Sequence, residues 1–293
     1  MKKIFLYLTF LIASGIFQIS KAQVRIEVGD RCSVDSLDVP QAIERTEWAT
    51  KCGYLDEETK NYYLFTGGQP RARPRYPIFT TPALEVWKAP TDRNASCDRP
   101  AQFTDITGCL SSCYTPDQRL AFIVSDEVNP IKKIIKWIDI ETAFKKQLPN
   151  VLAVAPESTL DNIKYMSASV SAYSHEFKDA WNDILEFRTA HGGKLKVTPN
   201  HPILDGDGRI REAGTFLIGD AFVAANGTRD PIVSIDKSRH FGQVYNLDTK
   251  TKNLKSKLVL AEGFVNGTLY YQNDGFGYMN RKLLREQIAG DLL

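Results

Sequence analysis

Residues 195–204 read LKVTPNHPIL, in which a threonine and a histidine stand three positions apart and each is followed by a proline. Pro202 biases His201 toward an extended backbone, because the proline ring clashes with a helical conformation of the residue before it. A strand that ends in this turn can aim Thr198 and His201 into one pocket. Two readings are open: a β-branched strand residue beside a turn histidine, or a pair that binds a substrate and moves a proton.

Short apolar segments separated by turn residues surround this stretch. Asn-Gly and Gly-Asp pairs are strong turn signals between short strands, so the segments predict a compact all-β domain. The segments are KLKVT, TFLI, AFVAA, PIVSI, QVYNL and KLVLAEGFV, with turn signals at Gly219-Asp220, Asn226-Gly227 and Asn266-Gly267.

The segments that precede LKVTPNHPIL have mixed periodicity. RLAFIV at 119–124 predicts a strand, and 130–148 mixes strand and helix signals. HEFKDAWNDILEFRTAHGG at 175–193 starts with helical spacing and closes in a Gly-Gly turn. At the other end of the chain, RKLLREQIAGDLL predicts an amphipathic helix within 274–293.

The first 22 residues combine Lys2 and Lys3 with an apolar run and small residues before Gln23. This pattern predicts a signal peptide at 1–22 that is cleaved on export. The alternative, a retained membrane anchor, is disfavoured because the apolar run is short. We therefore expect a secreted or extracytoplasmic protein, in the periplasm or at the cell surface, with no integral membrane span after signal removal.

The charge of the mature chain is nearly balanced. Removal of Lys2, Lys3 and Lys21 from the 37 basic residues leaves 34 against 35 acidic residues, a net charge of about −1. Such a balance gives no indication of a nucleic-acid partner or of an anionic membrane surface.

All five cysteines lie in the first half of the chain, in a polar and proline-rich region whose clearest helix is VPQAIERTEWATKCG, ending at Gly53. In an exported protein such cysteines form disulfides, and an odd count leaves one over. Pairing in sequence order would join Cys32 to Cys52 and Cys97 to Cys109, leaving Cys113 free. The alternative joins Cys97 to Cys113 and leaves Cys109 spare. No zinc or other metal site is expected, because no histidine lies near these cysteines.

Five short motifs, in order, resemble those of the Hint (hedgehog/intein) autoprocessing domains. Cys113-YTPDQRL resembles the domain-opening cysteine and first strand, and VTPNHPIL the Thr-x-x-His block, with Thr198 and His201 on the motif positions. The resemblance covers about 113–273. The remaining three motifs are GTFLIGDAFV for the Leu-x-x-Gly-Asp turn, QVYNLDT for Val-Tyr-Asp-Leu, and LVLAEGFV for the Ala-Asn-Gly strand.

The resemblance implies an N-to-S acyl shift at the Ser112-Cys113 bond. The Cys113 thiol would attack the carbonyl of Ser112 through a five-membered ring. His201 would protonate the departing amide nitrogen, and Thr198 would hold the scissile peptide in a distorted geometry. Cys109, which follows a hedgehog-like Gly108, is the alternative nucleophile.

The chain also departs from the family pattern. Gly267-Thr268 stand where splicing inteins have His-Asn, so we expect neither C-terminal cleavage nor splicing. Asn246 replaces the Asp of Val-Tyr-Asp-Leu, and Asp248 is a possible substitute. What remains resembles the hedgehog half-reaction, in which the amino-terminal segment becomes a thioester.

These inferences predict a mainly β protein, with a compact all-β Hint (horseshoe-like) domain, helical insertions and a small disulfide-stapled N-terminal module. The expected function is single-turnover self-cleavage without a cofactor, which releases the N-terminal segment or transfers it to water or another nucleophile. The alternatives are an inactive Hint-fold display or adhesion scaffold and a trans-acting cysteine hydrolase. The expected divisions are 1–22 signal peptide, 23–108 N-terminal module, 109–112 linker, 113–273 Hint-like domain and 274–293 C-terminal helix.

Overall fold

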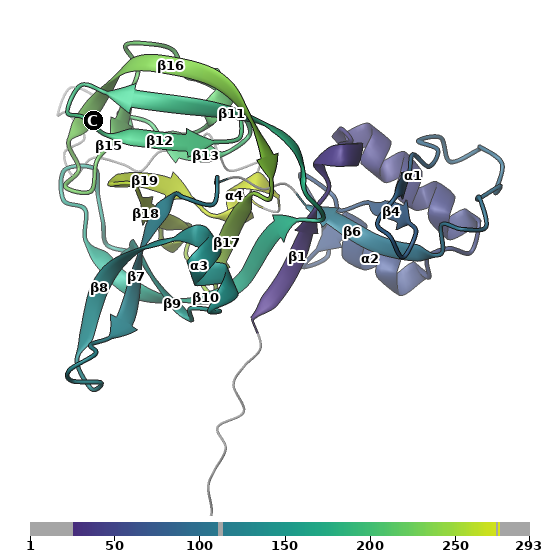
Figure 1. Ribbon diagram of the computed structural model, residues 1–293, viewed down its shortest axis with the longest axis horizontal. Helices are drawn as coiled ribbons and strands as arrows, with labels where there is room; N and C mark the ends of the chain where they lie inside the picture. The colour runs from purple at the N-terminus through teal and green to yellow at the C-terminus, as the bar shows by residue number, and fades with distance from the viewer. Residues whose placement is uncertain (1–25, 111–113, 274, 276–293) are drawn as a thin grey trace, which may run out of the picture.

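The computed structural model describes residues 26–110, 114–273 and 275. We call residues 26–110 the N-terminal module and residues 114–273 the β domain; Figure 1 shows them side by side. The module contains α1 (Val39–Lys51), α2 (Glu57–Leu64), the 3-10 turn η1 (Ser33–Asp35) and the strands β1 (Glu27–Arg31), β2 (Phe65–Thr66), β3 (Gln69–Pro70), β4 (Pro77–Thr80), β5 (Val86–Trp87) and β6 (Asp105–Leu110).

Helix α1 begins at a capping box. Asp38 accepts a hydrogen bond from the backbone N–H of Gln41, and the Gln41 side chain accepts one from the backbone of Asp38. Trp48 on the buried face of α1 is fully enclosed. The helix predicted to end at Gly53 is thus present, whereas α2, capped by Asp56, was not predicted.

Two disulfides close the module, and the expected pairing in sequence order is wrong. Cys32 pairs with Cys109 across 77 residues, and Cys52 pairs with Cys97. Strand β1 runs parallel to β6, so Cys32 and Cys109 at their ends become neighbours. Sequence proximity of cysteines carries no information about such a long-range strand pairing.

The β domain is built almost entirely of strands, as predicted. Two short helices, α3 (Ile140–Lys145) and α4 (Leu269–Gln272), and the turns η2 (Ala213–Thr215) and η3 (Lys255–Lys257) connect them. The strands are β7 (Arg119–Ser125), β8 (Lys133–Asp139), β9 (Asn150–Val154), β10 (Tyr165–Glu176), β11 (Ala180–Thr189), β12 (Lys194–Val197), β13 (Pro202–Leu204), β14 (Ile210–Glu212), β15 (Ala221–Val223), β16 (Arg229–Gly242), β17 (Tyr245–Thr249), β18 (Leu258–Ala261) and β19 (Phe264–Gly267).

Three local predictions fail in this domain. The segment 175–193 is not helical: its residues end β10 and form β11, which pairs with β16 along its whole length. The TFLI segment at 215–218 is not a strand: Thr215 is the last residue of η2, and Ile218 makes only an isolated bridge with Asp220. Asn266-Gly267 lies inside β19, while the turn that joins β18 to β19 is Glu262-Gly263, with φ of 49° and 86°. Tertiary pairing outweighs local signals here.

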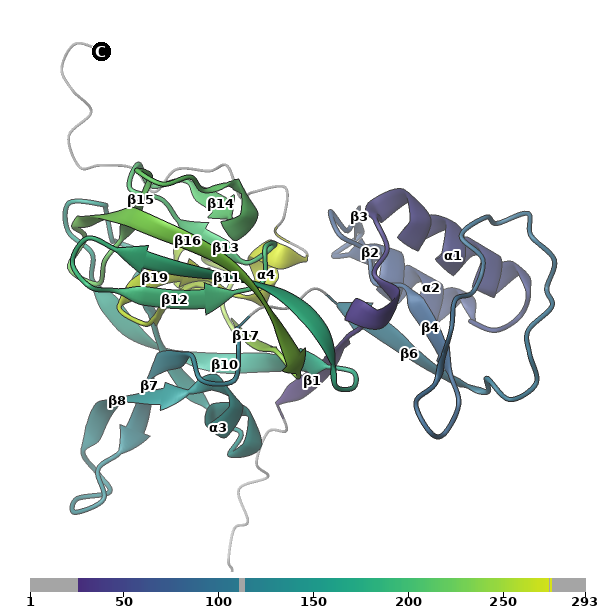
Figure 2. The same ribbon diagram turned by 45° about the horizontal axis from the view of Figure 1, so that its top comes forward.

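Strand β1 joins the two parts of the molecule. It pairs in parallel with β10 of the β domain over five residues and with β6 of the module over two. The strand order therefore runs β10-β1-β6-β4-β5 without a break, and Figure 2 shows β1 between β10 and β6. Helices α1 and α2 lie on the side of β1 that faces away from the β domain.

Within the described residues, no helix is both long and apolar enough to cross a membrane. The predicted signal peptide at 1–22 and nearly all of the predicted helix at 274–293 lie outside the described residues.

Candidate functional site

His201 sits in the turn between β12 and β13 and is fully buried. The backbone N–H of His201 donates to the carbonyl of Thr198 at 3.0 Å, and its carbonyl accepts from Ala213 at 2.7 Å. Pro202, the first residue of β13, continues the extended chain. The motif spacing thus forms a tight turn that brings Thr198 and His201 together, as the sequence predicts.

The two nitrogens of the His201 ring have different surroundings. Nε2 lies 3.1 Å from Oδ1 of Asn266, whose Nδ2 donates to the carbonyl of Phe264 at 2.9 Å. Since the amide oxygen faces the ring, Nε2 carries the proton and Nδ1 of the neutral ring holds a lone pair. Nδ1 is buried, and it has no hydrogen-bond partner among the described residues.

Burial lowers the pKa of His201 from its ordinary value of 6.5 to about 3, and the hydrogen bond with Asn266 opposes that shift. The imidazole is therefore neutral at physiological pH. The resemblance implied that His201 protonates the departing amide nitrogen. The buried ring must instead receive a proton from a reacting group before it can give one away.

Tyr114 covers the His201 ring. The two ring centroids are 4.3 Å apart and the Tyr114 side chain is fully buried. The backbone of Tyr114 exchanges two hydrogen bonds with Tyr245 of β17, at 2.8 and 2.9 Å, and also bridges Val197 of β12. Ser112 and Cys113, the predicted scissile pair, lie outside the described residues, and Tyr114 is the residue that follows them.

A chain of side-chain amides links Thr198 to β17. The Thr198 hydroxyl donates to Oδ1 of Asn200 at 2.8 Å. Gln272 of α4 donates from Nε2 to the Asn200 carbonyl at 2.9 Å and accepts at Oε1 from Asn246 at 2.8 Å. Thr198, Asn246 and Gln272 are all buried. The network fixes the turn at 198–201 against the strand that holds Tyr114.

Asp248, the possible substitute for the missing aspartate, is engaged elsewhere. One carboxylate oxygen lies 2.7 Å from Nζ of Lys257, and the other accepts from the Thr268 hydroxyl at 2.8 Å. Thr268 stands directly before α4, and its side chain makes no capping hydrogen bond to that helix. These contacts hold the C-terminal strands together.

A cavity of about 360 Å³ lies between the module and the β domain. Leu110, the last described residue before Tyr114, lines it, as do Asn200 of the turn and the side chains of Arg31 and Arg73. Water therefore has room beside the end of β6. Elsewhere in the described parts of the chain, no three histidine, cysteine, aspartate or glutamate side chains gather as metal ligands.

Three residues of this site were not identified from the sequence. Tyr114 was only the neighbour of Cys113, and Gln272 carried no motif at all. Asn266 was assigned to an Asn-Gly turn, although the apolar residues before it, Phe264 and Val265, are typical of a buried strand. A buried amide in such a strand must find a hydrogen-bonding partner, and here that partner is His201.

Comparison with solved structures finds inteins and intein-like domains. A DnaB intein from Synechocystis sp. PCC 6803 is 17% identical, with a TM-score of 0.40, over 54% of this chain and 99% of that chain. The transcription factor IIB Mvu mini-intein is 15% identical, with a TM-score of 0.42, over 54% and 100%. A bacterial intein-like domain from Clostridium thermocellum is 15% identical, with a TM-score of 0.36, over 53% and 99%.

No protein-family model matches the chain, and no curated protein matches its sequence. These likenesses concern the fold alone and extend to no residue's chemistry.

Proposed function

We propose that the protein is an exported self-processing protein that breaks its own Ser112-Cys113 bond through a thioester, without splicing. The observation that carries the proposal is the buried, unprotonated Nδ1 of His201 beside Tyr114, the residue that follows Cys113. A buried nitrogen with no partner among the described residues is costly unless a reacting group uses it. The proposal requires position 113 to lie beside Thr198 and His201.

The free thiol that this chemistry needs is consistent with the disulfides. Cys32 pairs with Cys109 and Cys52 with Cys97, so the chain has no further cysteine with which Cys113 could pair. The same pairing argues against Cys109 as the nucleophile, because its sulfur is already bonded.

The neutral state of His201 defines the order of proton transfers. Nδ1 accepts the thiol proton of Cys113 as the sulfur attacks the carbonyl carbon of Ser112. The C–N bond to Cys113 then breaks, and the imidazolium returns the proton to the departing nitrogen. Thr198 follows Val197, which forms a β-bridge with Tyr114, and it is therefore suited to hold the scissile peptide. Hydrolysis then gives a Ser112 carboxylate and regenerates the thiol, and the cavity beside Leu110 can admit the water.

Mass spectrometry of the purified mature protein tests the proposal. We expect an amino-terminal fragment that ends at Ser112, formed faster with added thiol and not formed by Cys113→Ala. His201→Ala should slow its formation by about 100-fold or more, whereas His191→Ala, at a mostly exposed histidine, should not. An intact chain under all these conditions would refute self-cleavage and favour a display scaffold.

A further inference from the structure

The strand β1 belongs by sequence to the amino-terminal product of the proposed cleavage, yet it is part of the sheet of the β domain. It pairs with β10 from Glu27↔Ala172 to Arg31↔Glu176. On the other side of the same stretch, β10 pairs with β17. Removal of β1 would therefore leave a row of unpaired backbone groups along β10, which is unfavourable.

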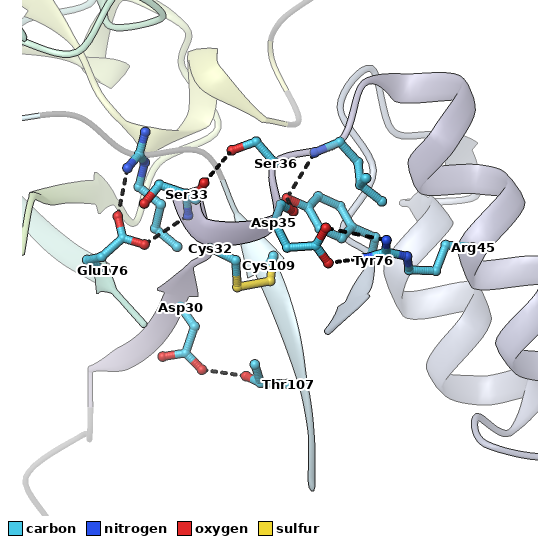
Figure 3. Close-up of a disulfide and its surroundings, with 12 residues drawn as sticks. Asp30, Cys32, Ser33, Asp35, Ser36, Arg45, Tyr76, Thr107, Cys109 and Glu176 are labelled. Carbon is cyan, nitrogen blue, oxygen red and sulfur yellow. Dashed lines mark hydrogen bonds and ion pairs between the residues drawn. A yellow bond between two sulfur atoms is a disulfide. The ribbon is translucent and has the colours of Figure 1, made fainter. Parts of the chain in front are cut away.

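A buried ion pair fastens the end of this strand, and Figure 3 shows it beside the Cys32–Cys109 disulfide. Glu176 is fully buried and accepts hydrogen bonds from Nη1 of Arg31 at 2.7 Å and from the backbone N–H of Ser33 at 2.9 Å. Arg31 also donates to Asn182 of β11. Without the module, the Glu176 carboxylate would lose both of these donors.

Apolar side chains cross the junction in both directions. Phe177 of the β domain packs against the core of the module, which contains Cys32, Tyr76 and Cys109. Ile26, which precedes β1, packs against the main core of the β domain. Each part thus completes the core of the other.

Further polar contacts lie away from β1. Arg73 of the module forms an ion pair with Glu212 of β14 at 2.5 Å. Lys178, in the turn between β10 and β11, donates to the carbonyl of Leu84 at 2.6 Å. The junction is therefore held at several separate points.

The Cys32–Cys109 disulfide links the docked strand β1 to the new carboxyl end that cleavage would create after β6. The proposed scissile bond follows β6, whose Cys109 is covalently joined to Cys32 directly after β1. Cleavage would free the end of β6 from Tyr114, but β6 would stay attached to the docked strand. We propose, on the basis of the proposed function, that cleavage leaves the module bound to the β domain as a two-chain complex, with β1 as the docking strand in β10. Separation of the two products then requires the backbone pairing between β1 and β10 to break.

A protease site placed between Leu110 and Tyr114 in the Cys113→Ala chain tests this without self-cleavage. After complete cutting, native mass spectrometry and size-exclusion chromatography at about 1 µM should show one 1:1 complex of the two fragments. Fragments that elute separately would overturn the inference. If the cut fragments stay together but the native chain, with Cys113 in place, never cleaves itself, the docking stands and only the proposed function is refuted.

Matched variants show which side chains contribute to the affinity between the two fragments. Glu176→Ala should raise the dissociation constant of the cut fragments by about 30-fold or more, and Phe177→Ala should also weaken it. Glu186→Ala is the control, because Glu186 of β11 pairs only with Arg188 and Lys194 of the β domain among its described ion pairs. The melting temperature of each uncut variant shows whether it is folded. Equal dissociation constants for Glu176→Ala and Glu186→Ala in folded chains would contradict the role of Glu176.

Discussion

The Nε2 atom of His201 lies 3.1 Å from Oδ1 of Asn266, and this contact decides which ring nitrogen is free. Asn266 cannot easily turn its amide round, because Nδ2 donates to the carbonyl of Phe264. The strand β19 therefore sets the tautomer of a histidine 65 residues earlier in the chain.

Replacement of Asn266 should impair the reaction through His201. In Asn266→Ala the N–H at Nε2 loses its acceptor, so the proton of the neutral ring is shared between Nε2 and Nδ1. A fraction of the molecules then has no lone pair at Nδ1. We expect self-cleavage to slow by about 100-fold, as measured by mass spectrometry after addition of thiol. Asn226→Ala is the matched control, since Asn226 also begins an Asn-Gly-Thr sequence but lies in a surface turn. Equal rates for the two variants would contradict the assignment.

Asn266→Asp tests the same contact in a different way. A carboxylate beside Nε2 favours the charged imidazolium and raises the pKa of His201 from its present value of about 3. We expect the rate of self-cleavage to fall on acidification at a higher pH in Asn266→Asp than in the native chain. A pH–rate profile that is unchanged by Asn266→Asp would show that the amide does not act through His201.

The buried state of His201 should make the fold sensitive to acid. Its pKa is about 3 in the folded protein, below the ordinary value of 6.5, so the unfolded chain binds the extra proton between these pH values. The free energy of unfolding should therefore fall as the pH falls from 6.5 toward 3, by up to about 1.4 kcal/mol per pH unit. Urea unfolding across this range should show a shallower dependence for His201→Gln, while His191→Gln keeps the native slope.

Gln272 should be important for stability as well as for the site. It donates to the Asn200 carbonyl and accepts from Asn246 in a fully buried position. Gln272→Leu would remove both of these buried hydrogen bonds, and we expect a loss of about 2 kcal/mol or more in the free energy of unfolding. Denaturant titration measures this loss. Substitution of the exposed Gln69 is the control, and a loss no larger than that of the control would argue against the network.

The Cys32–Cys109 disulfide should support the fold without taking part in the chemistry. In the double variant Cys32→Ser, Cys109→Ser, closure of the 77-residue loop is lost, at a cost of about 4 kcal/mol. The fragment should nevertheless still end at Ser112, as read by its mass. A fragment that ends at Gly108 in the native chain, and is lost in this variant, would instead identify Cys109 as the nucleophile.

The sequence by itself determined what depends on short-range pattern. Short apolar segments with turn residues predicted a mainly β domain, the stretch VPQAIERTEWATKCG predicted α1, and the spacing of Thr198 and His201 predicted one turn that carries both. These features are encoded within a few residues of chain, where local sterics and hydrogen bonds decide the conformation.

Only the tertiary structure decided which distant residues meet. Helical spacing after His175 gave way to a strand because β16 supplies a full-length partner for β11. The parallel pairing of β1 with β6 selected Cys109 as the partner of Cys32, and the position of β19 brought Asn266 to His201. Burial at that point lowered the pKa of the histidine. The physical reason is common to all of them: strand pairing and desolvation depend on contacts between segments far apart in the chain, which no local pattern contains.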